Sequence, residues 1–273
     1  MLFAYVLPDP ASYASWDEFE ADLAAVKETG YDAVELQIAD PALFDEARVR
    51  RSLQAVGCDM AAFQTGLTYL SRGNCLCTAD ERVRRRTIEL LRSFVDLAAG
   101  WNSVIVFGSL QGRQTDEPDR AAGEVRIREA MREVGQYASE KGATVAFEPV
   151  NHGEAGFHNT IAEVEEVVRG LGLPGVRMMV DTFHMNIEER DMLAPLGGIG
   201  DILAHVHLSE TNRDVLGSGR WPTGGFLSEL ERIGYGGACS VGVYHTRLSR
   251  RECMAACMKE IRRTGTKPEG SRA

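Results

Sequence analysis

Three side chains able to bind a metal ion come at the ends of apolar segments. Glu148 lies in "TVAFEPV", Asp181 ends "VRMMVD", and His207 lies in "ILAHVHLS". If these segments are parallel strands of one barrel, their carboxyl ends meet at the same rim. Ionised carboxylates are costly to bury alone, and a divalent cation would satisfy both. The pattern predicts a metal site of Glu148, Asp181 and His207 for Mn²⁺, Mg²⁺ or Co²⁺, with Zn²⁺ as an alternative.

Each of these residues also has a purely structural interpretation. Glu148 could pair with an arginine, Asp181 could cap the next helix, and His207 could be hydrogen-bonded in the core. Their occurrence at three successive strand ends favours the metal site. His205 shares a strand face with His207 and is expected to support it rather than bind the ion. Glu35 ends an earlier strand, where it could bind a sugar hydroxyl or pair with a neighbouring base.

The elements that must position these residues alternate along the whole chain. Eight β-like segments are predicted, and several of them are nearly continuous apolar runs, as in parallel strands that are buried on both faces. They span residues 2–7, 31–38, 59–64, 103–108, 144–150, 176–181, 202–209 and 238–244. Helical patterns follow them, over residues 15–30, 41–57, 79–99, 121–141, 160–170, 187–196, 224–233 and 249–263.

Eight β/α units in 273 residues favour an α/β fold of the (β/α)8 TIM-barrel type, in one domain. A doubly wound sheet is disfavoured because no GxGxxG motif follows the first strand. We expect the barrel to occupy residues 1–264 and the polar residues 265–273 to form a flexible C-terminal tail. The segment "TGLTYLSRGNCLCTAD", residues 65–80, is too long for a tight turn and is predicted to be a lid over the substrate.

Composition narrows the class of protein further. The formal net charge of −10 makes nucleic acid a poor partner. No apolar run is long enough to span a bilayer, so we expect no membrane partner and a cytoplasmic location. The six cysteines have no framework spacing and are expected to be free thiols. Six histidines and an acidic balance also argue against a DNA-repair endonuclease with a multi-zinc cluster.

The stretches "FEPVNHGEAGFHNT", "MMVDTFHMNIEE" and "HVHLSETNRDVLGSGRWP" resemble the xylose-isomerase-like sugar isomerases and epimerases. The resemblance is greatest to ketose 3-epimerases of the tagatose and psicose type, and "GYDAVELQ" and "ERIGYGGACSV" extend it to nearly the whole chain. It implies that Glu148, Asp181 and His207 bind the metal ion and that Glu148 is also a catalytic carboxylate. It further implies that three residues hold the sugar's carbonyl and neighbouring hydroxyls, namely Glu154, His184 and Arg213.

One position departs from the family pattern. The family ends its eighth strand with a glutamate that serves as fourth metal ligand and second acid/base, and Gly242 stands there in this chain. We expect an isomerase or epimerase that acts next to the carbonyl of an unphosphorylated sugar or polyol, through an enediolate with Glu148 as acid/base. A lyase or dehydratase with one carboxylate base and a catalytically impaired sugar-binding homologue stay open as alternatives. Tyr244 could donate the missing proton, or the glycine could make room for a larger substrate.

The resemblance also leads us to expect a homodimer or homotetramer. This expectation comes from the family resemblance alone.

Overall fold

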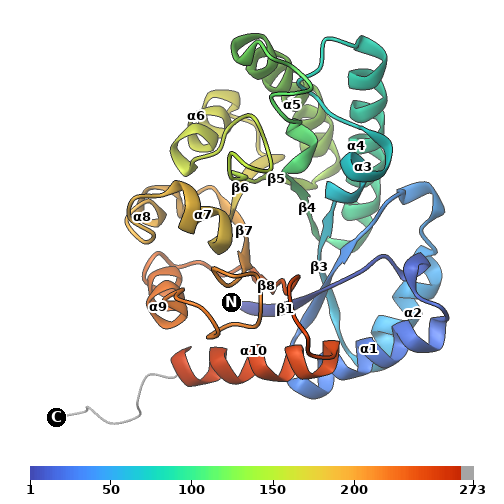
Figure 1. The fold of residues 1–273 in the computed structure, drawn as a ribbon. Helices are drawn as coiled ribbons and strands as arrows, with labels where there is room; N and C mark the ends of the chain where they lie inside the picture. Colours follow the sequence, from blue (N-terminus) through green and yellow to red (C-terminus); the bar gives the residue numbers. More distant parts are fainter. Residues whose placement is uncertain (266–273) are drawn as a thin grey trace.

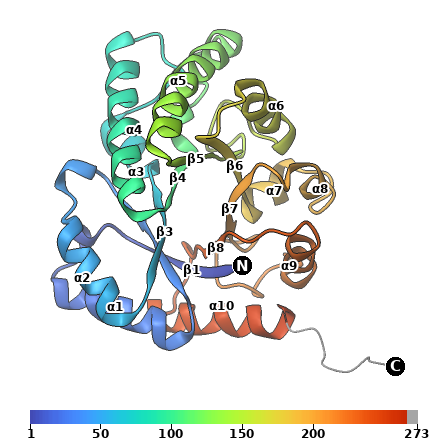
Figure 2. The ribbon, with the colours of Figure 1, turned by 180° about the vertical axis from the view of Figure 1, so that it is seen from behind.

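A computed structural model of the protein describes residues 1–265 and shows a closed barrel of eight parallel strands (Figures 1 and 2). The strands pair in chain order, and β8 closes the barrel on β1. They are β1 Leu2–Leu7, β2 Ala33–Gln37, β3 Asp59–Gln64, β4 Val104–Phe107, β5 Thr144–Phe147, β6 Val176–Asp181, β7 Leu203–Leu208 and β8 Ala238–Val241. The predicted TIM barrel is confirmed. Of the predicted tail, residues 266–273 lie outside the described part of the chain.

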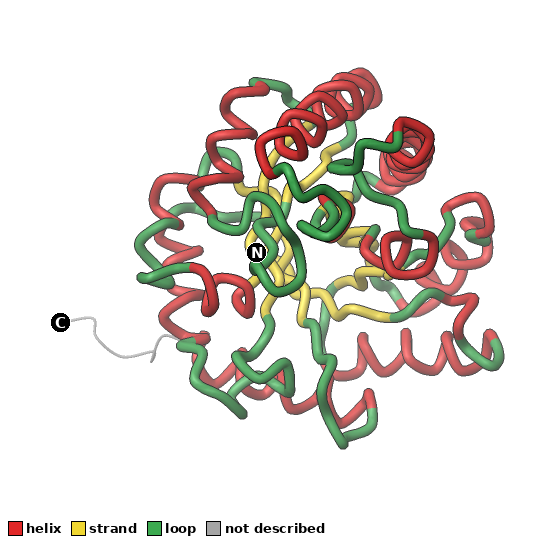
Figure 3. Tube along the Cα trace, turned by 45° about the horizontal axis from the view of Figure 1, so that its top comes forward, coloured by secondary structure: helices red, strands yellow, loops and turns green. Residues whose placement is uncertain are grey.

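The helices surround the strands, which Figure 3 shows at the centre of the molecule. The α-helices are α1 Trp16–Thr29, α2 Glu46–Val56, α3 Gly66–Arg72, α4 Glu81–Trp101, α5 Arg120–Lys141, α6 Ile161–Leu171, α7 Thr182–Glu188, α8 Leu196–Ile199, α9 Thr223–Arg232 and α10 Arg250–Gly265. Three short 3₁₀ helices are η1 Pro10–Ser12, η2 Pro41–Leu43 and η3 Ser109–Gln111. Apolar faces of the helices pack on the outer faces of the strands to form the main core.

Helix boundaries follow capping residues in the sequence. The Ser15 hydroxyl accepts a hydrogen bond from the Glu18 amide at the start of α1. Gly30 ends that helix at φ 102°, a left-handed conformation that glycine adopts without strain. Thr160 and Glu163 form a capping box at the start of α6, in which each side chain accepts from the other residue's backbone amide.

Two predicted segments between the strands differ from the structure. The helix expected over residues 187–196 is wrong, because α7 starts at Thr182, directly after β6, and ends at Glu188. The Asp181 carboxylate explains this early start: it accepts from the Phe183 amide at 2.7 Å and caps the helix. The segment expected to be a lid contains α3, so part of it is regular helix rather than loop.

Strand register brings the polar residues to the carboxyl end of the barrel. Asp181 pairs with His207 across β6 and β7, and Glu35 lies opposite Val6 near the end of β1. Inside the barrel, Ala62, Val106, Ala146 and Met179 form a small apolar cluster. Ala62 pairs in register with Glu35, and Met179 pairs with His205, so apolar and polar side chains share this layer of the interior.

No described helix is both long and apolar enough to cross a membrane. All six cysteines are buried free thiols, as the sequence predicted. The cytoplasmic location and the oligomeric state stay predictions.

Candidate active site

Glu148, Asp181 and His207 converge at the carboxyl-terminal rim of the barrel, and we call them the triad. One ligand atom from each lies within 4.8 Å of the others, and all three residues are buried. His207 Nδ1 lies 3.4 Å from Asp181 Oδ2 and 3.7 Å from Glu148 Oε1. Two carboxylate oxygens and one imidazole nitrogen facing a common point fit a divalent cation. The structure thus contains candidate metal-binding residues where the sequence predicted them.

Asp181 and His207 also have structural partners, so for these two residues both interpretations of the sequence hold together. Glu148 lies 3.7 Å from His184 and from His207, and it forms no ion pair with an arginine of the described residues. Asp181 caps α7 with Oδ1 and keeps Oδ2 toward the triad, where the Ser209 hydroxyl donates to it at 3.3 Å. His207 uses Nε2 to bond Glu35 Oε1 at 2.8 Å, which leaves Nδ1 for the triad. These contacts fix the orientation of both side chains before any ion binds.

Glu35 is fully buried and pairs with two histidines. Its Oε2 lies 2.7 Å from His205 Nε2, and its Oε1 lies 2.8 Å from His207 Nε2. Of the two interpretations left open by the sequence, pairing with a neighbouring base is therefore the correct one. His205 supports Glu35 and does not face the triad, in agreement with its predicted role. A carboxylate behind a ligating histidine holds the ring in one orientation and raises its basicity.

Burial and neighbouring charges shift the pKa values of the triad in different directions. Burial raises the pKa of Glu148 to about 8, although His207 acts against this shift. Burial would also raise the pKa of Asp181, but His184 and His207 hold it below its usual range. The pKa of His207 lies well above its usual range because the carboxylates of Glu35, Asp181 and Glu148 outweigh burial. Without an ion the triad therefore holds protons that an ion would displace.

Hydrogen bonds of its backbone and the absence of a side chain at Gly108 fix the position of Glu148. Its amide donates to the Phe107 carbonyl at 2.8 Å, and its carbonyl accepts from Gln111 Nε2 at 3.1 Å. A Cβ atom at Gly108 would collide with the Glu148 carboxylate and contact Val150. Sequence reasoning missed this requirement for glycine, because residues 108 and 148 come together only when β4 pairs with β5.

The residues predicted to hold the sugar lie beside the triad, along a cavity of about 250 Å³ that we call the triad cavity. Arg213 Nη2 lies 3.1 Å from Glu154 Oε1 and 3.4 Å from His184 Nε2. His184 Nε2 in turn lies 3.7 Å from Glu148 Oε1. The structure thus brings all six predicted residues to one cavity, and the roles assigned to them stay predictions.

Further lining residues were not identified from the sequence as site residues. Leu67 and Leu70 of α3 line the triad cavity, which places part of the predicted lid segment against it. Polar atoms come from Gln37, Gln64 and Ser109. The two glutamines could have been identified from their positions at strand ends, since Gln37 ends β2 and Gln64 ends β3.

The loop after β7 is built to present Arg213. Arg213 has φ 57°, a conformation that is uncommon for residues other than glycine, and its guanidinium packs over the Phe183 ring at 4.0 Å. Glu210 holds this loop by accepting backbone N–H groups of Thr211, Gly217 and Trp221. These hydrogen bonds fix the shape of the loop.

The eighth strand ends earlier than predicted. β8 stops at Val241, so Gly242 and Tyr244 lie just beyond it rather than within it. Tyr244 nevertheless lines the triad cavity. Position 242 contributes no carboxylate, and the triad has no fourth acidic ligand from this strand.

Comparisons with known proteins agree with this architecture. Residues 23–263 match the family described as xylose isomerase-like TIM barrel. A ketose 3-epimerase of Arthrobacter globiformis is 32% identical over 213 residues, which cover 77% of this chain and 72% of the relative. An L-ribulose 3-epimerase of Methylomonas sp. (strain DH-1) is 30% identical over 79% of this chain and 74% of the relative.

Solved structures show the same fold. A D-allulose 3-epimerase from Methylomonas sp. in complex with D-allulose superposes with a TM-score of 0.80 at 22% identity, covering 97% of each chain. A D-psicose 3-epimerase in the presence of D-fructose gives a TM-score of 0.77 at 25% identity, covering 95% of this chain and 90% of that one. The chain therefore belongs to the xylose isomerase-like TIM-barrel family, as a member of its group of sugar isomerases and epimerases.

Proposed function

We propose that this protein is a metal-dependent isomerase or epimerase that acts next to the carbonyl of an unphosphorylated ketose or related polyol. The observation that carries the proposal is the convergence of Glu148, Asp181 and His207 at the carboxyl-terminal rim. Relatives named as ketose and L-ribulose 3-epimerases support the substrate class. The mixed donor set favours Mn²⁺, Mg²⁺ or Co²⁺ over Zn²⁺.

A divalent ion held by the triad would polarise the substrate carbonyl and the neighbouring hydroxyl. The Glu148 carboxylate takes the proton from the adjacent carbon, and the C–H electron pair moves toward the carbonyl oxygen to give an enediolate. Arg213 and His184 donate hydrogen bonds to substrate oxygens from the wall of the triad cavity. General acid/base help of this kind contributes about 10² to 10⁴-fold to the rate.

The fate of the proton decides between isomerisation and epimerisation. Return of the proton from Glu148 to the neighbouring carbon, with transfer of the hydroxyl proton between the two oxygens, gives an isomer. Inversion at one carbon requires a proton from the opposite face of the enediolate. Gly242 offers no carboxylate for that step, so the second donor in an epimerisation has to be another group of the cavity or water.

A second candidate is a lyase or dehydratase in which Glu148 is the one carboxylate base. The observation that favours it is the absence of a side chain at Gly242 together with the Tyr244 ring beside it. In that reaction Glu148 removes the proton and a hydroxyl on the next carbon leaves as water, which gives a dicarbonyl product. The two candidates share the first step and differ in the second.

The test is metal analysis of the purified protein, followed by incubation with a panel of ketoses in D₂O. The proposal predicts deuterium at the carbon next to the carbonyl in a product that keeps the elemental composition of the substrate. Loss of water would identify the lyase. A Glu148→Gln variant should lose exchange because an amide cannot take the proton, and a Glu154→Gln variant should keep measurable exchange. Metal-loaded protein that exchanges no proton with any ketose would contradict both candidates and leave a sugar-binding homologue.

A further inference from the structure

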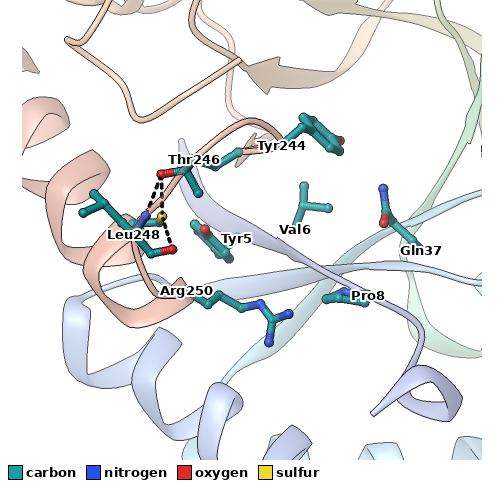
Figure 4. Close-up of a pocket in the computed structure, with 10 residues that line it drawn as sticks. Tyr5, Val6, Pro8, Gln37, Tyr244, Thr246, Leu248 and Arg250 are labelled. Carbon is teal, nitrogen blue, oxygen red and sulfur yellow. Dashed lines mark hydrogen bonds between the residues drawn. The ribbon is translucent and has the colours of Figure 1, made fainter. Parts of the chain in front are cut away.

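A second cavity adjoins the triad cavity on the side of β8 and β1. It measures about 350 Å³, and we call it the outer cavity. Figure 4 shows Tyr5 and Val6 from β1 at its centre, with Leu248 and Arg250 on one side and Tyr244 and Gln37 on the other. Tyr244 and Gln37 are the residues that line both cavities. The Tyr244 ring is therefore part of the wall between them.

The Tyr244 ring lies where a side chain at position 242 would project. A Cβ atom built on Gly242 would be 2.9 Å from Tyr244 Cε2 and 3.2 Å from its hydroxyl oxygen. The first distance is shorter than carbon atoms tolerate, so even alanine at position 242 requires the ring to move. Gly242 and the position of Tyr244 are thus two parts of one arrangement.

Contacts with the β7 loop hold Tyr244 in this position. The Tyr244 and His245 amides both donate to the Arg213 carbonyl, at 2.9 and 3.0 Å. The Arg213 guanidinium lies 5.1 Å from the centre of the Tyr244 ring, on a side chain that also packs over Phe183. Tyr244 itself is 39% exposed, so it is not a residue of the hydrophobic core. These contacts place the ring against the arginine that faces the substrate.

We propose that Tyr244 is a specificity-determining residue, whose ring closes the triad cavity toward the outer cavity and restricts it to a single unsubstituted ketose. The proposal rests on the proposed function for its substrate class. Gly242 is the residue that allows the ring to adopt this position. When the ring is removed, the two cavities join, and a ketose that carries a further sugar unit gains space beyond the triad.

The outer cavity has the chemistry to receive such a unit. Its lining combines apolar surface from Val6, Pro8 and Leu248 with polar groups from Tyr5 and Thr246. The Tyr5 side chain, which lines this cavity, carries a hydroxyl that can both donate and accept a hydrogen bond. Hydroxyl groups over an apolar floor suit the faces of a neutral pyranose ring.

The experiment compares D-fructose with isomaltulose, a reducing disaccharide that ends in fructose, in the metal-loaded protein. Variants are Tyr244→Ala, Tyr244→Phe, Gly242→Ala and, as a matched control, Leu248→Ala, which alters the outer cavity but not the wall. Three quantities are measured: turnover in D₂O, ligand-induced shift of the melting temperature, and the dissociation constant for Mn²⁺.

Tyr244→Ala should shift the preference from D-fructose toward isomaltulose by about tenfold or more, in binding and in kcat/KM. Gly242→Ala should shift it in the same direction by displacing the ring, and the Gly242→Ala/Tyr244→Ala double variant should behave like Tyr244→Ala alone. Tyr244→Phe and Leu248→Ala should keep the preference of the unmodified protein. The Mn²⁺ dissociation constant should change by less than about threefold in Tyr244→Ala, because the ring is not a ligand.

Several results would overturn the proposal. An unchanged preference in Tyr244→Ala would show that the ring is not the wall. A preference lost equally in Tyr244→Phe would assign selectivity to the hydroxyl, and a large loss of Mn²⁺ affinity would assign Tyr244 to the metal site. Failure of the proposed function looks different: the unmodified protein would then turn over no ketose, while the shifts in melting temperature would still report which sugars bind.

Discussion

Binding of a divalent ion to the triad should displace protons and therefore depend steeply on pH. The perturbation is a change from pH 8 to pH 6 in metal-free protein. Burial raises the pKa of Glu148 to about 8, so below that pH a proton occupies the carboxylate that the ion needs. The pKa of His207 is also raised, because the carboxylates around it outweigh burial, and this adds a second proton for the ion to displace. Asp181 is already ionised because its pKa is lowered.

The magnitude follows from the ionised fraction of Glu148. With a pKa of about 8, roughly half of the carboxylate is ionised at pH 8 and about 1% at pH 6. The dissociation constant for Mn²⁺ should therefore rise about 50-fold on that account alone, and further because of His207. The sign is fixed: a raised carboxyl pKa lets protons compete with the ion, so affinity falls as pH falls.

Isothermal titration of Mn²⁺ at both pH values, in buffers that differ in ionisation enthalpy, measures affinity and proton release together. We expect between one and about two protons released per ion at pH 6. Glu148→Gln should release about one proton fewer and show a shallower dependence on pH. A dissociation constant that is equal at pH 6 and pH 8, or binding without proton release, would refute the assignment of Glu148 and His207 as ligands.

Three further variants separate metal binding from stability. Asp181→Asn should weaken Mn²⁺ binding strongly but lower the stability of the metal-free protein by less than about 1 kcal/mol, because asparagine still caps α7. Metal titration and urea denaturation measure the two effects, and a loss of stability as large as the loss of binding free energy would argue against the triad. Glu35→Gln should weaken metal binding by about 10- to 100-fold, because Glu35 orients His207 without facing the ion; unaltered affinity would show that this carboxylate does not orient the ring. Thr160→Ala should lower the free energy of unfolding by about 0.5–2 kcal/mol through loss of the capping box with Glu163, and leave metal affinity unchanged; a changed affinity would mean that α6 contributes to the site.

Several features of the molecule could be predicted from residue types and spacing. Eight apolar segments separated by helical patterns were enough to predict the barrel, because each β/α unit is recognised from its own residues. Ser15 and Gly30 fixed the limits of α1 in the same way, since a cap needs only its own helix. Parallel strands share one carboxyl-terminal rim, so the meeting of Glu148, Asp181 and His207 also followed from their places in the sequence.

Other features were decided by contacts between distant segments. Glu35 pairs with His205 and His207 across about a hundred and seventy residues of sequence, and no local pattern distinguishes that pairing from binding a sugar. The early start of α7 depends on Asp181, which caps the helix with one carboxylate oxygen and turns the other toward His207. The helical pattern over residues 187–196 did not show that the helix begins directly after β6.

The sequence by itself determined the barrel and the three side chains able to hold an ion, because both depend on the order of residues within single β/α units. Only the tertiary structure shows which residue occupies the space beside Gly242. Sequence showed only that a carboxylate is missing there, whereas the folded chain places the Tyr244 ring in the vacated space and Arg213 beside it. Which atom fills a space depends on the packing of separate loops, and that packing exists only after the barrel has closed.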